Sequence, residues 1–378
     1  MTPSPTSPHS SPTWADARRQ LAFHHWLDSL AFAEGLDPQS LRVASADASF
    51  RRYLRIDCTQ PGVGSRIIMD APPDKEDCKP FAKVAALTTQ AGLQAPQILA
   101  WDESNGFMLL SDLGHHTLMQ HIQATTPPLG DHFYPQDPPA LPVQLLFNQA
   151  IDALVKWQLS SQPGVLPAYD EPLLRRELAL FPDWYLAQHK GVSVDADMRA
   201  TLDKVFDTVV ARNLAAPQVY VHRDYMPRNL MMPVAEGAPL GILDFQDAVY
   251  GPISYDIASL MRDAFWTWDE PYVIDVTVRY WQQARKVGLM DFEDWHQDFG
   301  AFYRAVEWMG LQRHLKVAGI FARLTLRDGK PNYLADTPRF IQYLRGTAGR
   351  YRELTPLLRL LDKVENIQAV TGYAFGRV

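Results

Sequence analysis

Two short segments constrain the fold of this 378-residue chain most strongly, because each sets polar side chains directly after an apolar run. Residues 221–232 contain a His-x-Asp core that ends at Asp224, with Asn229 five residues after the aspartate. Residues 241–247 begin with an apolar run that ends at Asp244, fifteen residues after Asn229. Short apolar runs of this kind are typical of buried strands. The pattern therefore predicts a strand that presents Asp244 at a fixed place and a loop that presents Asp224 and Asn229.

The order of these side chains matches the arrangement by which kinase-type enzymes transfer a phosphoryl group. In that arrangement one aspartate accepts the proton of the attacking hydroxyl, while an asparagine and a second aspartate hold Mg²⁺ against the nucleotide phosphates. Asp224 is then the expected catalytic base, and Asn229 and Asp244 are the expected metal ligands. His222 and Asp256 are expected to support the loop rather than to touch substrate. Either segment taken alone is also compatible with a chance match and an ordinary strand end.

Composition narrows the class of protein further. The formal net charge is −7 and the pI is near 5.9, which argues against general nucleic-acid binding because no basic field meets the phosphates. The two cysteines, Cys58 and Cys78, form no metal or redox motif, so no disulfide framework or zinc site is expected and a reducing, cytoplasmic compartment fits. No apolar run is long enough to span a membrane. Residues 1–13 are rich in Ser, Thr and Pro, which predicts a disordered tail rather than a secretory signal.

The first third of the chain predicts a small antiparallel sheet. Residues 50–56 alternate, with Arg52, Leu54 and Ile56 on one face and Arg51 on the other. Asn105-Gly106 is a good hairpin turn between two further strands. The expected helices cover residues 14–35 and 81–91, and the expected strands cover residues 41–43, 50–56, 66–69, 98–101 and 107–110.

The rest of the chain is mostly helical by pattern. Residues 121–142 contain six prolines from Pro127 to Pro142 and are predicted to be an irregular loop. A buried strand is expected over residues 218–221, directly before the His-x-Asp core. The expected helices cover residues 145–159, 173–188, 198–214, 257–265, 273–288, 295–321 and 338–364. The predicted class is α+β, with a small antiparallel-sheet N-lobe and a larger, mainly helical C-lobe.

Several motifs together resemble the aminoglycoside phosphotransferase family, which has the two-lobed protein-kinase-like fold. The similarity runs over nearly the whole chain after the tail. It is closer still to the branch of anomeric sugar kinases that act on N-acetylmuramate and N-acetylglucosamine. The family resemblance is carried by residues 222–224, 229, 244–246 and 251–256. The closer resemblance is carried by residues 47–53, 69–73, 110–114, 175–178, 181–186, 244–248 and 308–317.

This resemblance implies an activity and a separate role for each of the two lobes. It implies an ATP-dependent and Mg²⁺-dependent kinase that forms a sugar 1-phosphate in bacterial cell-wall recycling, and a nucleotidyltransferase that takes the product next. No nucleic-acid or membrane partner is expected. Residues 14–112 are the expected nucleotide-covering N-lobe, and residues 113–378 are the expected catalytic and substrate-binding C-lobe.

The expected nucleotide site departs from the kinase pattern in one respect. Kinases carry a lysine on the third strand to hold the α- and β-phosphates, but residues 66–70 contain none. Arg51 or Arg52 of the preceding hairpin is the expected substitute, although either is equally well explained as a solvated strand arginine. The small residues from Ser45 to Ser49 leave room for a close backbone approach to the phosphates. Asp112 lies near the expected crossing between the lobes, where the adenine would bind.

The substrate contacts are less constrained by the sequence. The lactyl carboxylate of N-acetylmuramate requires a cation or a helix N-terminus, which suggests Arg175 and Arg313, while Gln246 and Asp247 follow Asp244 within a shared motif. Two other hypotheses remain open. One is a kinase for another small alcohol, of the aminoglycoside or choline type. The other is a nucleotide-binding pseudokinase, which the missing lysine favours and the intact Asp224, Asn229 and Asp244 oppose.

Overall fold

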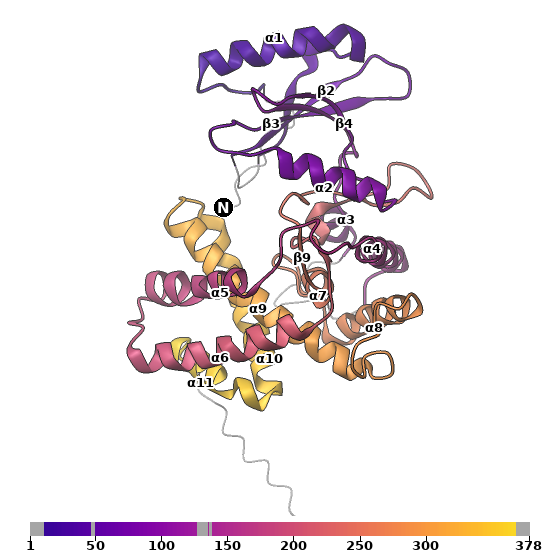
Figure 1. Ribbon diagram of the computed structural model, residues 1–378. Helices are drawn as coiled ribbons and strands as arrows, with labels where there is room; N and C mark the ends of the chain where they lie inside the picture. Colours follow the sequence, from indigo (N-terminus) through magenta and orange to yellow (C-terminus); the bar gives the residue numbers. More distant parts are fainter. Residues whose placement is uncertain (1–10, 47–49, 127–134, 136–137, 368–378) are drawn as a thin grey trace, which may run out of the picture. The chain divides into compact units, whose positions relative to one another are not determined.

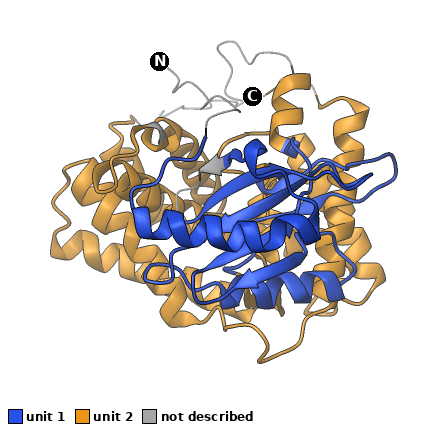
Figure 2. Cartoon of the chain, turned by 90° about the horizontal axis from the view of Figure 1, so that it is seen from above, with its two compact units in different colours: residues 1–118, 229–247 blue, residues 119–228, 248–378 orange. Residues whose placement is uncertain are grey.

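The structure is a computed structural model that describes residues 11–46, 50–126, 135 and 138–367. The chain forms two compact units, coloured separately in Figure 2. Unit 1 comprises Met1–Leu118 and Asn229–Asp247, and unit 2 comprises Met119–Arg228 and Ala248–Val378. Asp224 therefore belongs to unit 2, whereas the two predicted metal ligands belong to unit 1. The functional division into a nucleotide-covering part and a catalytic part stays a prediction.

Unit 1 is built on the predicted antiparallel sheet. Its five strands have the order β1-β2-β3-β5-β4, and Figure 1 shows α1 on one side of the sheet and α2 on the other. The elements are α1 (Ala17–Glu34), η1 (Pro38–Ser40), β1 (Arg42–Ala46), β2 (Arg52–Asp57), β3 (Ser65–Asp70), α2 (Lys79–Gln90), β4 (Ile98–Asp102) and β5 (Phe107–Ser111).

The core of unit 1 lies between the sheet and α1. Phe23 and Leu27 of α1 are buried against Leu54, Ile56 and their neighbours Ile68, Phe107 and Leu109. The alternation predicted for β2 is confirmed, since Leu54 and Ile56 both face this core. Gly106 closes the β4–β5 hairpin at φ 69°, and a Cβ there would lie 1.9 Å from the carbonyl oxygen of Ala71. Only glycine fits this turn.

A second, two-stranded ladder carries the predicted metal ligands. β7 (Leu230–Met231) pairs antiparallel with β8 (Gly241–Ile242), and both strands are buried. The amide of Met232 donates to the carbonyl of His116 at 2.9 Å, and the amide of Ile242 donates to Gln94 at 2.7 Å. The residues from Asn229 to Asp247 are thus fixed to the rest of unit 1 through their backbone.

Unit 2 is mainly helical, as predicted. One two-stranded ladder, β6 with β9, leads into the segment that contains Asp224. The elements are α3 (Leu118–Thr125), α4 (Leu141–Leu159), α5 (Glu171–Leu180), η2 (Phe181–His189), α6 (Ala196–Ala215), β6 (Gln218–Val221), η3 (Pro227–Asn229), β9 (Val249–Pro252), α7 (Ser254–Met261), α8 (Glu270–Lys286), α9 (Phe299–Leu326), η4 (Pro331–Asp336), α10 (Thr337–Arg350), η5 (Arg352–Leu354) and α11 (Thr355–Val364).

The prediction of an irregular loop over residues 121–142 was wrong at both ends. Helix α3 continues to Thr125 because Leu118 and Ile122, one helical turn apart, are both buried. Helix α4 starts at Leu141 with Pro142 in its first turn, where a missing N–H costs no hydrogen bond. Residues 127–134, 136 and 137 lie outside the described part of the chain.

The predicted helix over residues 173–188 changes its winding partway. Helix α5 passes at Phe181 into η2, a π-helix, next to Pro182, which has no amide hydrogen to donate to the preceding turn. Gly319 of α9 packs against this junction, where a Cβ would lie 2.3 Å from the carbonyl oxygen of Leu180. The close packing of α9 on this segment therefore needs a glycine.

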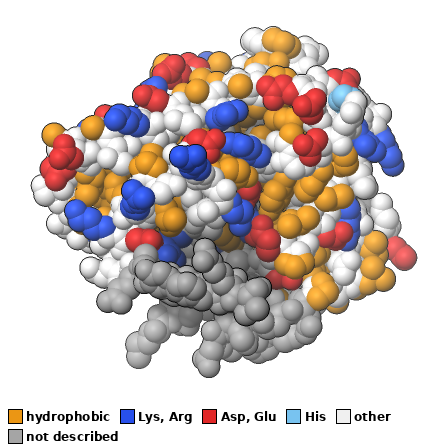
Figure 3. Space-filling view, turned by 90° about the horizontal axis from the view of Figure 1, so that it is seen from below, with side chains coloured by type: hydrophobic (Ala, Val, Ile, Leu, Met, Phe, Trp, Pro, Cys, Tyr) orange, Lys and Arg blue, Asp and Glu red, His pale blue; other side chains and the backbone are white. Residues whose placement is uncertain are grey.

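The surface carries charges of both signs. On the described part of the face in Figure 3, acidic and basic side chains are interspersed among hydrophobic ones. Within the described residues, no helix has an apolar stretch of the length that a bilayer requires.

Candidate active site

The segment with Asp224 follows β6, whose Val219, Tyr220 and Val221 are buried. Asp256, in the first turn of α7, is fully buried and accepts hydrogen bonds from the backbone N–H of His222 at 2.7 Å and of Arg223 at 3.0 Å. Burial raises the pKa of Asp256 to about 7, although the two N–H donors oppose the shift. Asp256 therefore fixes the backbone directly before Asp224.

Arg223 adopts an unusual backbone conformation at this point. Its φ is 75°, in the left-handed region that a non-glycine residue enters at a cost of about 1–3 kcal/mol. Its guanidinium donates to Glu177 of α5 at 2.6 Å. Arg223 is thus held by both its backbone and its side chain, and Asp224, which is partly exposed, follows it immediately.

The predicted metal ligands meet within unit 1. The side-chain amide of Asn229 lies 3.3 Å from the carboxylate of Asp244, and the amide of Leu243 donates to the carbonyl of Asn229 at 2.9 Å. Asp244 also has a left-handed backbone, at φ 61°. Gln246 donates to the second oxygen of Asp244 at 2.9 Å. The structure therefore brings Asn229, Asp244 and Gln246 together, and Gln246 contacts a predicted metal ligand.

These side chains suit a magnesium ion that is shared with a nucleotide. Mg²⁺ prefers oxygen ligands and is commonly held by one or two carboxylates together with substrate phosphates. Asn229 and Asp244 supply an amide and a carboxylate side by side. Among the described residues, no group of three His, Cys, Asp or Glu side chains is placed to hold a metal alone. The donor set fits a metal whose coordination is completed by phosphates and water.

The two hairpin arginines lie on opposite sides of the sheet. Arg52 faces α1, where its Nε donates to Asp70 at 2.5 Å and its guanidinium lies 3.8 Å from the ring centre of Trp14. Arg51 pairs with Glu76, just before α2, at 3.1 Å. The sequence did not distinguish Arg51 from Arg52 as the substitute for the missing lysine, but the structure places them in different surroundings.

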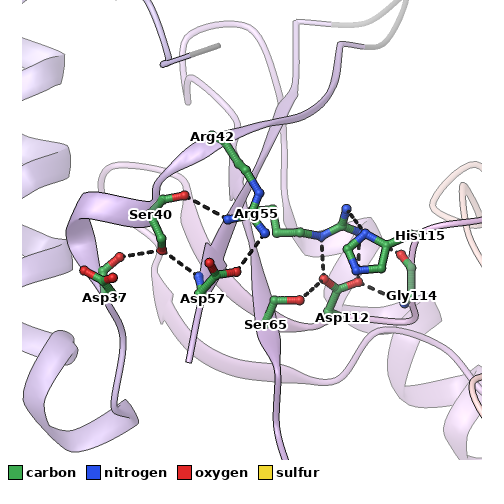
Figure 4. Close-up of polar contacts among 9 residues, drawn as sticks. All are labelled: Asp37, Ser40, Arg42, Arg55, Asp57, Ser65, Asp112, Gly114 and His115. Carbon is green, nitrogen blue, oxygen red and sulfur yellow. Dashed lines mark hydrogen bonds and ion pairs between the residues drawn. The ribbon is translucent and has the colours of Figure 1, made fainter. Parts of the chain in front are cut away.

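Asp112 lies in a polar network inside unit 1 (Figure 4). It accepts hydrogen bonds from Arg55 at 2.6 Å, from Ser65 at 2.7 Å and from the amide of Gly114 at 2.9 Å. Although burial alone would raise the pKa of Asp112, these partners lower it below its ordinary value. Asp112 fixes the segment that follows β5. Ser45 belongs to β1, and Ser49 lies outside the described residues.

The other predicted substrate residues have separate surroundings. Arg175 lies on the surface of α5 and pairs with Glu171 at 2.6 Å and with Asp207 at 2.7 Å. Arg313 is buried in α9, where a guanidinium nitrogen lies 3.9 Å from the sulfur of Met226. Asp247 is exposed. The substrate roles of Arg175, Arg313, Gln246 and Asp247 stay predictions.

Sequence reasoning gave no role beside Asp224 to two charged residues that lie next to it in the structure. Glu177 and Lys316 are both buried, and each interacts with Arg223 or Asp224. A signal for Glu177 was available, because it shares the apolar face of α5 with the buried Leu174 and Leu178. A carboxylate on such a face is buried, and a buried charge is stable only when it is paired with a cation.

The fold and these side chains define a kinase-like phosphotransferase. The chain belongs to the phosphotransferase enzyme family, whose signature matches residues 40–298. It is 48% identical to the N-acetylmuramate/N-acetylglucosamine kinase of Pseudomonas aeruginosa, over 92% of this chain and 96% of that protein. It is 43% identical to the kinase of the same name from Neisseria meningitidis, over 95% of this chain and 100% of that protein.

Solved structures share the fold at low sequence identity. An ethanolamine kinase of Plasmodium vivax is 12% identical, with a TM-score of 0.59 over 93% of each chain. The gentamicin complex of the aminoglycoside phosphotransferase APH(2")-IIa is 12% identical, with a TM-score of 0.56 over 88% of this chain and 97% of that one. The predicted protein-kinase-like fold is confirmed.

Proposed function

We propose that this protein is an ATP-dependent sugar kinase that phosphorylates the anomeric hydroxyl of N-acetylmuramate and N-acetylglucosamine. The observation that carries the proposal is the near full-length similarity to kinases named for these two sugars, at 43–48% identity. The site supports the reaction type, since Asp224 lies in a braced loop and Asn229 lies beside Asp244. The product is the sugar 1-phosphate, formed in cell-wall recycling.

In the proposed reaction Asp224 accepts the proton of the sugar hydroxyl as its oxygen attacks the γ-phosphorus of ATP. A new oxygen–phosphorus bond forms, the bond to the β-phosphate oxygen breaks, and ADP leaves. An anomeric hydroxyl is more acidic than an ordinary alcohol, so one carboxylate is an adequate base. Mg²⁺, when held by Asn229 and Asp244, takes up charge on the β- and γ-phosphates.

Arg51 is the proposed substitute for the missing strand lysine. It lies on the side of the sheet opposite α1, and its pair with Glu76 is of the same type as the kinase lysine–glutamate pair. Arg52 is engaged by Asp70 on the α1 side. We also propose that the backbone near Ser45 and Ser49 approaches the phosphates, and that Asp112 orders the segment against which the adenine binds.

The proposed product has a further consequence for the enzymes around it. A sugar 1-phosphate is the usual acceptor for a nucleotidyltransferase, which would form a nucleotide sugar from it and release pyrophosphate. An enzyme of that class is therefore the proposed consumer of the product, in the same reducing compartment.

An ATP-consumption assay on the purified protein tests the proposal. The acceptors are N-acetylmuramate, N-acetylglucosamine, choline and gentamicin, with the Asp224→Asn variant as the control for background hydrolysis. We expect turnover with the two amino sugars alone. Turnover with gentamicin or choline alone would replace the proposed substrate class, and nucleotide binding without any turnover would indicate a pseudokinase.

A further inference from the structure

A buried carboxylate lies beneath the proposed catalytic loop, residues 222–226 between β6 and η3, and connects four elements of unit 2. Glu177 of α5 is 4% exposed. One of its oxygens accepts from Arg223 at 2.6 Å and from Lys316 of α9 at 3.0 Å, and the other accepts from the hydroxyl of Tyr169. Lys316 also donates to the hydroxyl of Tyr255 in α7 at 3.3 Å. Every oxygen of Glu177 is therefore engaged.

Glu177, Arg223 and Lys316 form an ionised cluster, and its two cations interact with Asp224. Burial alone would raise the pKa of Glu177, but Lys316 and Arg223 keep it below the ordinary value. Both Arg223 and Lys316 also interact electrostatically with Asp224. Glu177 thus competes with Asp224 for the same two cations and holds them on the buried side of the loop.

Glu177 also helps to hold Arg223 in its left-handed backbone conformation. A strained residue keeps its conformation only when its surroundings over-determine it. Asp256 fixes its backbone N–H, and Glu177 fixes the far end of its side chain. Asp224 follows directly, so any relaxation at Arg223 moves the carboxylate that is proposed to meet the substrate.

We infer that Glu177 is a positioning residue for the phosphoryl-transfer reaction: by holding Arg223 and Lys316, it fixes Asp224 in place and keeps its carboxylate available. The inference rests on the proposed role of Asp224 as the base. The inference differs from a merely structural ion pair in what it predicts: loss of Glu177 should lower the rate of turnover in molecules that remain folded.

The test measures kcat, both KM values and the thermal midpoint of the Glu177→Gln variant, with the best acceptor of the wild-type protein. A displacement of about 1 Å in a reacting group can cost about 100-fold in rate, so we expect kcat to fall about 100-fold with both KM values within threefold of wild type. Glu353→Gln is the matched control, because Glu353 pairs with Arg304, another cation of α9, at 2.6 Å on the surface. We expect it to behave as wild type.

A double variant keeps the inference testable if Glu177→Gln is unstable. Glu177→Gln with Lys316→Met removes one charge of each sign, so the cluster keeps its net charge. We expect the double variant to regain thermal stability while kcat stays low. Recovery of kcat together with stability would overturn the inference, as would a near-normal kcat in Glu177→Gln. An inactive wild-type protein would instead count against the proposed function.

Discussion

The loop of unit 2 that holds the proposed base Asp224 and the segment of unit 1 that holds the proposed metal ligand Asp244 fix their aspartates by different physical means. Both use a left-handed residue, Arg223 directly before Asp224 and Asp244 itself. The loop is held by buried carboxylates, Asp256 on its backbone and Glu177 on a side chain. The metal-ligand segment is held by the β7–β8 ladder and by backbone bonds to the rest of unit 1.

The difference has consequences for how each region responds to change. A carboxylate held by buried charges depends on pH and on each single partner, because an unpaired buried charge is strongly destabilising. A carboxylate held by a backbone ladder depends instead on strand pairing and tolerates changes in neighbouring side chains. Substitutions and pH should therefore affect the two regions differently.

The largest effect is expected from the proposed base, Asp224. Asp224→Asn keeps the size of the side chain but cannot accept the proton, and general-base catalysis typically contributes 10²–10⁴-fold. We expect kcat to fall about 1,000-fold, with the affinity for ATP within threefold of wild type. Steady-state kinetics and a nucleotide-binding titration measure both quantities, and near-normal turnover would refute the assigned role.

Loss of the proposed metal ligand Asp244 is expected to act on nucleotide binding as well. Asp244→Ala removes the carboxylate while the β7–β8 ladder remains, so we expect the fold to persist and the affinity for Mg²⁺-ATP to fall at least tenfold. Calorimetric titration of ATP with and without Mg²⁺ tests this. An unchanged magnesium dependence would contradict the metal-ligand assignment.

Substitution of the two hairpin arginines is expected to have smaller effects, which differ between Arg51 and Arg52. Arg51→Ala should raise the KM for ATP about 5–20-fold, because it removes a charge from the side of the sheet opposite α1. Arg52→Ala should leave that KM unchanged and lower the thermal midpoint, because Asp70, which is 1% exposed, loses one of its two cations. The reverse result would show that Arg52 meets the phosphates.

Stability is expected to depend on pH through Asp256. Its pKa is about 7 in the folded protein and 3.8 in an unfolded chain. A raised carboxyl pKa adds stability that is complete below pH 4 and is lost as the pH rises to about 7. The thermal midpoint of wild type relative to Asp256→Asn should therefore fall between pH 4 and 7. A difference that does not change with pH would show that Asp256 does not titrate in this range.

Local patterns made much of this molecule predictable. Alternation identified the buried face of β2, and the sequence pattern singled out Asn229 and Asp244, which the structure brings together. The partners of Glu177 were not predictable, because Arg223 and Lys316 lie far along the chain and pair with it only after α5 and α9 have packed together. Alternation also placed Arg51 and Arg52 on opposite faces without showing that α1 covers the face of Arg52. The close packing of α9 at Gly319 against Leu180 joins segments far apart in the chain, and no local pattern signals it.

Phosphorus NMR of the product formed from ATP and N-acetylmuramate tests the proposed phosphorylation of the anomeric hydroxyl most directly. The wild-type protein should give a phosphate signal coupled to the anomeric proton, and Asp224→Asn should give almost none in the same time. A signal from a 6-phosphate, or phosphorylation of an aminoglycoside without any sugar product, would contradict the account.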